Sequence, residues 1–554
     1  MPREEARARL ARVARERAVR YRASGAWRDA SIGDAFLAAC SAREDDVVLF
    51  DRDEAIAFRE LRERVLRLAV GLAAIGVRPG DAVAYQLPNW WEAAAALLAT
   101  SLAGACAVPI VPILRTREVS FILDQTRPRA LLVPARHRDV DHAAQAEAAS
   151  AALGRDRPVI VVVRGSAGAP SGATSFESLL ANAPASARDP RVPIDPDSPA
   201  VVIYTSGSTA DPKGAVHSHN TLSAEVASLV AAHALGARDR VLMPSPLTHV
   251  SGVVHGILCP ALLGTSAVLM ERWDAGAGIA AIERQRVTYM IGAPTFLQEI
   301  LAHPDVARRD LSSLRLYSCG GATVPPELLR AARSRLPGMV AKRVYGSSEF
   351  PTIATTTAED AAARGLDTEG RPLAGVEIRI TDERGRALPA GAEGEIRARG
   401  PDCFLGYTDP ALDAESFDRD GFFRTGDLGV QDAEGYLRIT GRVKDIIVRK
   451  GEKLSAREIE DLLSAHPAVA EVAVVPVADR ATGERACACV RLRAGADAPT
   501  LAALVDFLRA RDLTPQKLPE QLEIIDDFPR TPSGKVHKRF LREQIEAKAA
   551  RAGA

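Results

Sequence analysis

A loop rich in hydroxyls and glycines carries the clearest chemistry in this sequence. It spans Thr205–Gly214 and follows an apolar run, Ala200–Tyr204, that predicts a buried strand. Backbone N–H groups, side-chain hydroxyls and a cation are donors that suit a polyphosphate. The loop is not a Walker A motif, because its glycine follows its lysine. It predicts either a phosphate site of another kind or a flexible Ser/Gly connection, and its candidate binding residues are Thr205, Ser206, Gly207, Ser208, Thr209 and Lys213.

Four more motifs follow this loop along the chain. Each combines glycine with hydroxyl, carboxylate or cationic side chains, and any one of them is only moderately specific. Five motifs in one fixed order argue strongly against coincidence. The four are Tyr345-Gly346-Ser347-Ser348-Glu349, Arg424-Thr425-Gly426-Asp427, Gly441-Arg442-Val443-Lys444-Asp445 and Pro529-Arg530-Thr531-Pro532-Ser533-Gly534-Lys535.

The elements that must hold these motifs change in type near Gly441. From Ile32 to Ile439, strand-like apolar runs alternate with Ala/Leu-rich helical stretches, which predicts α/β structure with helices covering sheets. After Gly441 the pattern is compact α+β, and Ser455 opens a helix through a capping box with Glu458. A chain of 554 residues also exceeds what one core supports. We therefore predict a large N-terminal α/β domain of layered sheets and helices, residues 1–441, and a small mobile α+β C-terminal domain, residues 442–554.

The composition is that of a globular enzyme. Basic and acidic residues balance at 71 each, which argues against a nucleic-acid partner. No apolar run is long enough to predict a transmembrane segment. Met1–Arg20 lacks an apolar signal region and predicts an exposed helix. Seven dispersed cysteines predict reduced thiols and a cytoplasmic location, with Cys487 and Cys489 packed in a core rather than binding zinc.

Together the five motifs resemble those of the adenylate-forming superfamily, which includes acyl-CoA synthetases, carrier-protein-loading adenylation domains and firefly-type luciferases. The resemblance covers most of the chain. It is nearest to short- and medium-chain fatty acyl-CoA synthetases and cyclohexanecarboxylate-CoA ligases, through Pro246–His249, Cys319–Pro325 and Gly441–Arg449. Such enzymes join a carboxylate to ATP, release pyrophosphate and pass the acyl group to coenzyme A.

The resemblance implies roles for the matching residues. A carboxylate that meets a phosphate needs cations and aimed donors where negative charge develops. Lys535 matches the catalytic lysine that bridges the two anions, and Glu349 matches a ligand of Mg²⁺, a hard ion that prefers oxygen. Asp427 would accept from the ribose hydroxyls. The residues implied for ATP and AMP binding are Thr205, Ser206, Gly207, Ser208, Thr209, Lys213, Gly321, Ala322, Thr323, Tyr345, Gly346, Ser347, Ser348, Asp427 and Arg442.

Two positions depart from the family pattern. Ala210 stands where the family usually has glycine, and Ala restricts positive φ, which puts the detail of the loop in doubt. Ser348 stands where the family usually has Thr, and either hydroxyl donates to phosphate. Alternatives stay open for other residues: core packing for Tyr345, a salt bridge at the domain junction for Arg442, and a surface position for Lys535.

By the same resemblance, the acyl pocket involves His249, Val250, Gly252, Val253 and Gly320. Amino-acid-activating relatives usually place a carboxylate where Val250 stands, to pair with the substrate's ammonium group. A buried ammonium without a partner is costly, so an uncharged aliphatic or alicyclic acid of short to medium length is favoured. His249 is a catalytic candidate, either as a gate between acyl group and thiol or as a structural hydrogen bonder.

The resemblance also implies a moving domain and a thiol acceptor. Lys444 falls at the family's hinge, and Gly451 at the face that would line the coenzyme A passage, unless it is a simple turn glycine. About nineteen residues follow Lys535, too few for a carrier domain, so we expect any acyl-carrier protein to act in trans. The predictions are an ATP-, Mg²⁺- and coenzyme A-dependent ligase, a stand-alone enzyme that loads a carrier protein, or a non-catalytic nucleotide-binding regulator, with a homodimer left open.

Overall fold

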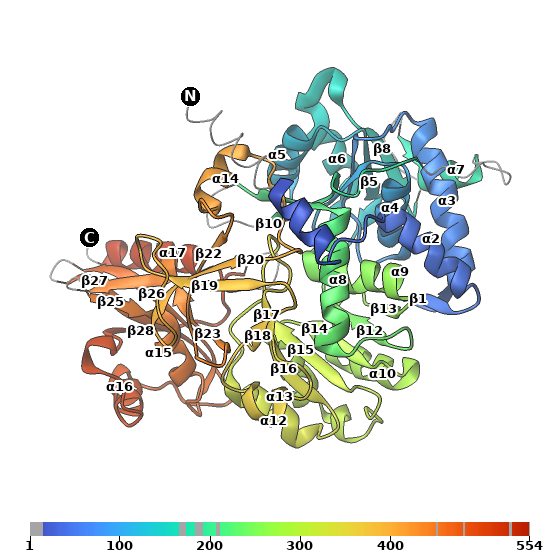
Figure 1. Cartoon of the computed structure of the whole chain (residues 1–554). Helices are drawn as coiled ribbons and strands as arrows, with labels where there is room; N and C mark the ends of the chain where they lie inside the picture. The colour runs from blue at the N-terminus through green and yellow to red at the C-terminus, as the bar shows by residue number, and fades with distance from the viewer. Residues whose placement is uncertain are drawn as a thin grey trace.

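Two large sheets form the body of the molecule (Figure 1). The computed structural model describes residues 15–165, 173–182, 192–205, 211–449, 452–479, 482–530 and 535–552. The nine-stranded sheet runs in the order β18 (Arg371–Pro372), β17 (Ala354–Thr355), β16 (Val340–Tyr345), β15 (Leu316–Gly320), β14 (Tyr289–Gly292), β12 (Arg240–Met243), β13 (Ser266–Leu269), β1 (Val47–Asp51) and β2 (Glu54–Ala57). The eight-stranded sheet runs in the order β21 (Gly406–Tyr407), β11 (Lys213–Ser218), β10 (Pro199–Thr205), β4 (Cys106–Pro109), β3 (Ala82–Tyr85), β5 (Ala130–Pro134), β8 (Val159–Val163) and β9 (Thr174–Ser175).

Alternate residues of these strands face different hydrophobic cores. On β12, Val241 and Met243 belong to the core between the two sheets, and Leu242 belongs to the core on the outer face. On β3, Val83 and Ala84 divide in the same way between the shared core and the second outer core. Strands that are buried on both faces read as continuous apolar runs, which explains why their sequences predict layered α/β structure.

The helices complete these layers. Helices that contribute to the shared core are α2 (Ile32–Ala42), α3 (Phe58–Ala74), α4 (Trp91–Leu102), α7 (Phe176–Ala181), α8 (His219–His233), the π-helix η2 (Gly252–Leu258) and α9 (Cys259–Leu263). Those over the outer faces are α10 (Ala275–Gln285), α11 (Pro294–Ala302) and α12 (Pro326–Arg335) on one sheet, and α5 (Thr116–Thr126) and α6 (His142–Ser150) on the other. Short helices α13 (Ala361–Arg364) and α14 (Pro410–Ser416) lie in later connections.

A third, antiparallel sheet leads to the C-terminal part of the chain. Its strands are β19 (Glu377–Thr381), β20 (Glu393–Arg399), β22 (Phe423–Gln431) and β23 (Leu437–Arg442). The short 3₁₀ turn η4 (Val443–Asp445) follows β23. The last sheet then contains β25 (Glu452–Ser455), β24 (Ile446–Arg449), β27 (Gly483–Leu492), β26 (Val469–Asp479) and β28 (Gln521–Ile524).

The C-terminal sheet and its helices form a separate body, orange to red at the left of Figure 1. Its helices are α15 (Ala456–Leu463), α16 (Leu501–Arg509) and α17 (Lys538–Ala552). The Ser455 hydroxyl accepts from the Glu458 N–H at the start of α15, as the capping box predicts. The predicted fold class, a large α/β region followed by a smaller α+β region, is confirmed. Cys487 and Cys489 on β27 are buried in its core, also as predicted.

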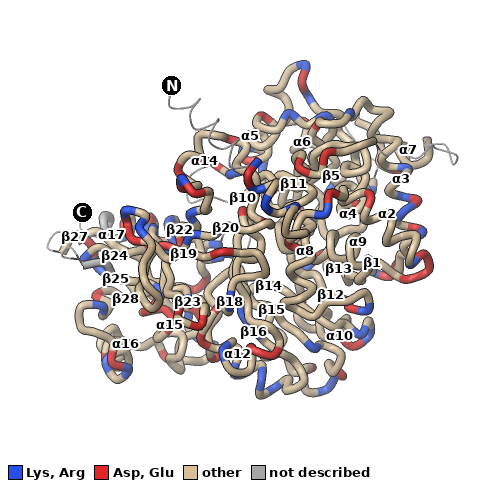
Figure 2. The backbone as a smooth tube through the Cα atoms, in the orientation of Figure 1, with Lys and Arg blue, Asp and Glu red and all other residues tan. Residues whose placement is uncertain are grey.

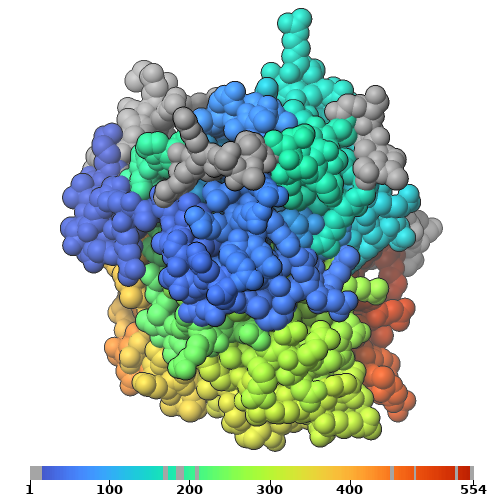
Figure 3. Space-filling view, turned by 90° about the vertical axis from the view of Figure 1, so that its right-hand side faces the viewer, coloured from blue at the N-terminus to red at the C-terminus, as the bar shows by residue number. Residues whose placement is uncertain are grey.

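The N-terminal segment is helical and docks through one face. Of the predicted exposed helix, residues 15–20 are described, and 15, 16, 19 and 20 are exposed, whereas Arg17 is only 8% exposed. Just after it, Tyr21 and Trp27 pack against Ala224 of α8, and the Trp27 indole N–H donates to the Pro401 carbonyl. The described part of the helix is therefore exposed on its outer face, and the docking of its inner face was not predicted. Figure 3 shows N-terminal residues (blue) lying across cyan and green parts of the chain.

Charges of both signs are interspersed over the fold. Blue and red positions alternate along the tube in Figure 2, in agreement with the balanced composition. Within the described ranges, no helix has both the length and the apolar character needed to cross a membrane. All seven cysteines are free thiols.

Candidate active site

The site begins where neighbouring parallel strands end together. β15 ends at Gly320 and β16 at Tyr345, and the two strands pair in parallel with Gly320 opposite Val344. The carboxyl ends of adjacent parallel strands form the edge at which α/β sheets bind ligands. The segments Gly321–Thr323 and Gly346–Glu349 therefore leave the sheet side by side. Residues 321–323 are exposed, so they are accessible to a ligand.

Asp427 and Arg442 meet across two antiparallel strands. They are directly opposite in the pairing of β22 with β23, and the Arg442 Nε lies 2.8 Å from Asp427 Oδ1. The other carboxylate oxygen accepts from the Tyr345 hydroxyl at 2.8 Å. Burial and the Asp427 charge hold the pKa of Tyr345 well above its usual value, so the phenol stays a donor. The Arg442 side chain is 59% exposed and is open to a ligand as well.

Glu349 is fixed by a tyrosine from a distant segment. The Tyr407 hydroxyl donates to Glu349 Oε1 at 2.7 Å, and the Phe404 N–H donates to the Glu349 carbonyl at 2.8 Å. The Lys213 ammonium lies 5.6 Å from the centre of the Tyr407 ring. Tyr407 therefore joins the phosphate loop to Glu349. Sequence reasoning missed it, because the contact depends on the pairing of β21 with β11, which no local pattern announces.

Lys535 reaches this edge from the C-terminal part of the chain. Burial and the nearby Arg442 cation lower the pKa of Lys535, whereas the Asp427 and Glu349 carboxylates raise it. Burial, with Lys535 close by, lowers the pKa of His249 to about 4, so this imidazole is neutral at pH 7. The His249 Nδ1 lies 3.1 Å from the Ser251 hydroxyl. The structure thus brings together five predicted residues that are far apart in the sequence.

The turn between Tyr345 and Glu349 is held by its backbone. The Ser347 N–H donates to the Phe350 carbonyl, and the Ser347 hydroxyl accepts from the Phe350 N–H. The His217 Nε2 lies 2.7 Å from the Ser348 carbonyl, so this buried histidine also holds the turn. Within the part of the chain that the structure describes, no cluster of three or more metal-binding side chains occurs.

Parts of the predicted phosphate and thiol sites lie outside the described residues. Ser206, Gly207, Ser208 and Thr209 fall there, and so does Gly451. Thr205 and Lys213, the flanks of the phosphate loop, are paired across the β10–β11 hairpin. Lys444 lies exposed in η4, between the third and the last sheet.

The glycines in and beside the predicted acyl pocket are needed for different physical reasons. A Cβ on Gly320 would lie 2.5 Å from the Val344 carbonyl, and one on Gly252 would lie 2.0 Å from the Pro246 carbonyl. Both glycines therefore serve close packing of backbone, and their place in the acyl pocket stays a prediction. Gly321 differs, because its φ is +78° and the space around it is open.

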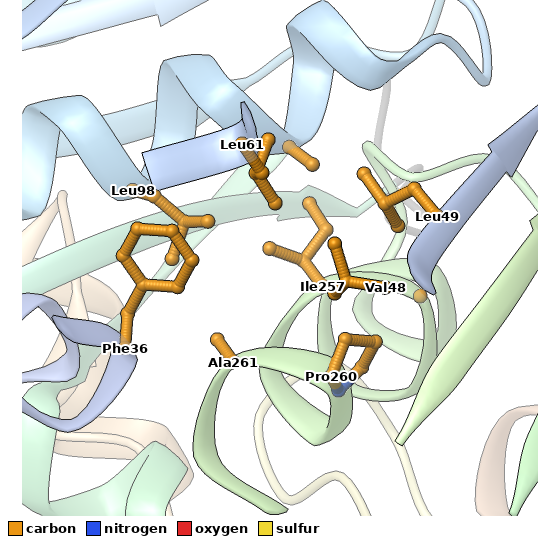
Figure 4. A pocket seen from close by; sticks show the side chains of 10 residues that line it. Phe36, Val48, Leu49, Leu61, Leu98, Ile257, Pro260 and Ala261 are labelled. Carbon is orange, nitrogen blue, oxygen red and sulfur yellow. The ribbon is translucent and has the colours of Figure 1, made fainter. Parts of the chain in front are cut away.

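The apolar cavity of Figure 4 lies elsewhere in the shared core. It holds little more than one water-sized molecule and is bordered by α2, β1, α3, α4, η2 and α9. No predicted nucleotide-binding or acyl-pocket residue lines it; its walls are Phe36, Val48, Leu49, Leu61, Ala94, Leu98, Gly256, Ile257, Pro260 and Ala261. We regard it as a packing void.

Comparisons with known proteins agree with this geometry. Residues 36–408 match the family model of the AMP-binding enzyme, and residues 458–535 match that of the AMP-binding enzyme C-terminal domain. The chain is 35% identical over 535 residues to the medium-chain fatty-acid–CoA ligase of Escherichia coli, covering 96% of this chain and 93% of that protein. It is 34% identical to a feruloyl-CoA synthase of Amycolatopsis sp, covering 89% and 94%. The crystal structure of ATP-bound MatB from Rhodopseudomonas palustris superposes with a TM-score of 0.85 at 27% identity, covering 94% and 99%.

Proposed function

Since the chain belongs to the AMP-binding enzyme family and is an AMP-forming acyl-CoA synthetase, we propose that its acid substrate is an uncharged aliphatic or alicyclic carboxylic acid of short to medium length. The observation that carries this proposal is the apolar wall beside His249. Val250 is 7% exposed and Val253 is fully buried, and both belong to the shared hydrophobic core. An α-ammonium group placed there would lose its water without gaining a carboxylate.

The convergent charges support the role of each catalytic group. Lys535 would stabilise the negative charge that develops where the acid's carboxylate meets the α-phosphate of ATP. The Glu349 carboxylate, one oxygen of which is engaged by Tyr407, offers the oxygen chemistry that Mg²⁺ prefers. When bound, the ion would neutralise charge on the phosphates. Asp427 would hold the ribose hydroxyls, while Tyr345 and Arg442 hold Asp427.

The remaining nucleotide residues complete the proposed site. Gly321, Ala322 and Thr323 would face the adenine, and the phosphate loop, with Lys213 at its end, would hold the polyphosphate. Neutral His249 would line the passage between the acyl group and the thiol. We also propose that residues 442–554 turn about Lys444 to admit coenzyme A, and that the enzyme is cytoplasmic, in keeping with its free thiols.

A panel of size-matched acids tests the substrate class. With ATP, Mg²⁺ and coenzyme A, we expect hexanoate to exceed norleucine, its α-amino counterpart, by at least about 10²-fold in AMP release, because an unpaired buried charge costs several kcal/mol. We expect cyclohexanecarboxylate to exceed benzoate and ferulate. The mass of the product identifies the thioester, and a purified acyl-carrier protein replaces coenzyme A in a parallel arm. Faster turnover of norleucine, or of the aromatic acids, would contradict the proposal.

A further inference from the structure

Two buried carboxyl groups face each other behind the turn that carries Glu349. Glu225 on α8 is 1% exposed, and Asp402, between β20 and β21, is fully buried. Their carboxyl groups interact with each other, because each shifts the pKa of the other. Glu225 Oε2 and both Asp402 oxygens have no other hydrogen-bond partner among the described residues. Two neighbouring buried carboxylates cannot both ionise at low cost, which favours one proton shared between them.

The surroundings offer little to compensate a second negative charge. Burial, followed by the Asp402 charge, raises the pKa of Glu225 well above its usual range, and burial raises the pKa of Asp402 to about 7. The nearest cation is Arg17, whose guanidinium is engaged by the carbonyls of Cys403 and Phe404. The other titratable groups that face the pair are the neutral thiols of Cys259 and Cys403.

The pair lies where three segments of the catalytic edge cross. The Thr352 hydroxyl, three residues after Glu349, donates to Glu225 Oε1 at 2.7 Å. Two residues after Asp402, the Phe404 N–H donates to the Glu349 carbonyl. Three residues further on, Tyr407 holds the Glu349 carboxylate. The contact between Glu225 and Asp402 therefore joins, from behind, the two segments that together fix Glu349.

The docked N-terminal segment contacts the same region, residues 401–404 and the part of α8 next to Glu225. Arg17 and Trp27 bind the carbonyls of the 401–404 segment, and Tyr21 packs beside Ala224, the neighbour of Glu225. Residues 401–404 are thus held on one side by the N-terminal residues and on the other side by the contact between Glu225 and Asp402. Two buried acids that have only the Arg17 cation near them among the described residues, itself engaged by two carbonyls, need a reason beyond packing, because apolar side chains would cost less.

We propose that Glu225 and Asp402 are positioning residues for Glu349, and that the proton they share holds the 347–352 turn against the 401–407 segment. The inference rests on the proposed role of Glu349 toward the metal–nucleotide complex. When the pair releases its proton to solvent at alkaline pH, the two negative charges repel and the contact opens. Glu349 then loses its alignment, so the use of MgATP declines.

Variants of Asp402 test the shared proton. Asp402→Asn keeps a donor for ionised Glu225 and should keep kcat/KM for MgATP at pH 7 within about threefold, because a hydrogen bond replaces a hydrogen bond. The alkaline decline of that parameter should move to higher pH. Asp402→Ala should lower kcat/KM by at least about tenfold, since small misplacements of catalytic groups are costly. Wild-type kinetics in Asp402→Ala, or an unchanged pH profile in Asp402→Asn, would overturn the proposal.

Two further variants keep the test informative if Asp402→Ala does not fold. Thr352→Val removes the donor to Glu225 at constant volume and should raise KM for MgATP, and Thr352→Ser should restore it. Glu92→Gln is the matched control, because Glu92 of α4 is also a buried acid whose pKa is raised by burial, but its partner is the Arg164 cation and not a carboxyl group. In this control, the alkaline decline of kcat/KM for MgATP should match that of the wild type. A shift as large as that of Asp402→Asn would refute the pairing argument.

A stability measurement without nucleotide gives an independent readout. Because burial raises both folded-state pKa values, this pair holds more protons in the folded chain than in the unfolded chain above about pH 4, and its contribution to stability is lost at alkaline pH. Above about pH 7, where the buried histidines are neutral in both states, wild-type Tm should therefore fall as the pH rises, and Asp402→Asn should flatten this slope; an identical slope would count against the shared proton. If Glu349→Gln leaves MgATP binding unchanged, the proposed role of Glu349 fails. If Glu349→Gln weakens binding and Thr352→Val does not, the positioning inference fails.

Discussion

The two sides of the active site are held in physically different ways. Tyr345 and Cys319, at the ends of β16 and β15, are part of hydrophobic cores that continue through the body of the molecule. Lys535 comes from a region with cores of its own, and no hydrophobic cluster of the described residues joins those before Arg442 to those after Asp445. The proposed nucleotide side is thus fixed by packing. The proposed catalytic residue, Lys535, comes from a region that, among the described residues, shares no hydrophobic core with the rest.

Polar contacts take the place of packing between these regions. Arg457 of α15 lies 3.2 Å from Glu369, which also lies 3.4 Å from Arg343 of β16. The Ser455 hydroxyl donates to the Thr440 carbonyl. Interfaces of this polar kind between domains of one chain generally permit relative motion. The binding edge is therefore rigid, whereas the region that carries Lys535 can change its position. The proposed turn about Lys444 requires this difference.

Removal of the lysine is the strongest way to separate the two sides. Lys535→Ala should lower acyl-adenylate formation by at least about 10²-fold, because its charge is needed where carboxylate meets phosphate. Thioester formation from supplied acyl-AMP should stay near the wild-type rate, since that step no longer joins two anions. Pyrophosphate exchange and thioester mass report the two half-reactions separately.

A surface lysine provides the control for this variant. Lys548 of α17 is 73% exposed and, within the described ranges, forms a salt bridge with Glu523, so Lys548→Ala should leave both half-reactions unchanged. Equal loss of both half-reactions in Lys535→Ala would mean that the lysine supports the domain as a whole. Lys535 would then matter for the folding of its domain and not for the chemistry of adenylation.

Weakening the polar interface should shift the balance between the half-reactions. Arg457→Gln leaves Glu369 with Arg343 and the Ile439 N–H as partners, and makes the arrangement that brings Lys535 to the site less stable by ~1.4 kcal/mol, which lowers adenylate formation about tenfold. Thioester formation from supplied acyl-AMP should be equal or faster, because the domain leaves its present position more readily. Single-turnover rates of both steps check this.

The matched control keeps its ion pair inside the domain. Lys517 lies 2.6 Å from Glu458 of the same domain, so Lys517→Gln removes a comparable contact without touching the interface. It should change neither half-reaction. A parallel decline of both steps in Arg457→Gln would indicate a rigid junction and would remove the support for a domain that moves.

Much of the fold was predictable because its strands are buried on both faces. The runs Val159–Val163 and Val469–Val477 are strands β8 and β26, and the helix opened by Ser455 begins where its cap predicts. The apolar run Leu314–Ser318 predicts a strand, but the observed strand β15 begins two residues later, at Leu316. The reason is that the Leu314 N–H closes a turn by donating to the Leu311 carbonyl. Local periodicity marks a strand, but not the turn that delays it. The boundary between residues 441 and 442 stays a prediction.

The candidate site was predictable only where a motif carried it. Asp427, Arg442 and Lys535 were expected together and lie together, although their ligands stay predictions. Tyr407 and the Glu225–Asp402 pair were not expected, because each depends on pairing between segments more than fifty residues apart and each has an ordinary sequence context. Nonlocal contacts of this kind have no period and no turn signal from which they can be inferred.

The smallest effect concerns the packed side of the comparison. Val48 of β1 is fully buried and lines the cavity of Figure 4, so Val48→Ile adds one methyl-sized group where there is room for it. We expect Tm to rise by about 1–3 °C, the usual gain from filling a small void. Val241→Ile makes the same change in the same core at a position that does not line the cavity, and it should lower Tm through overpacking.

The acid preference of Val48→Ile sharpens the comparison further. If the cavity is a packing void, the ranking of acids from about four to ten carbons, lengths suited to a pocket of roughly 300–1,000 Å³, should match the wild type. The nucleotide edge and Lys535 are untouched, so kcat/KM should also be unchanged. A shift of the preference toward shorter acids would show that the acyl tail extends along η2, past Val253, as far as Ile257. The packed core would then determine the length of the acid as well as hold the site in place. The fixed side of the molecule would therefore select the acid substrate as well as the nucleotide.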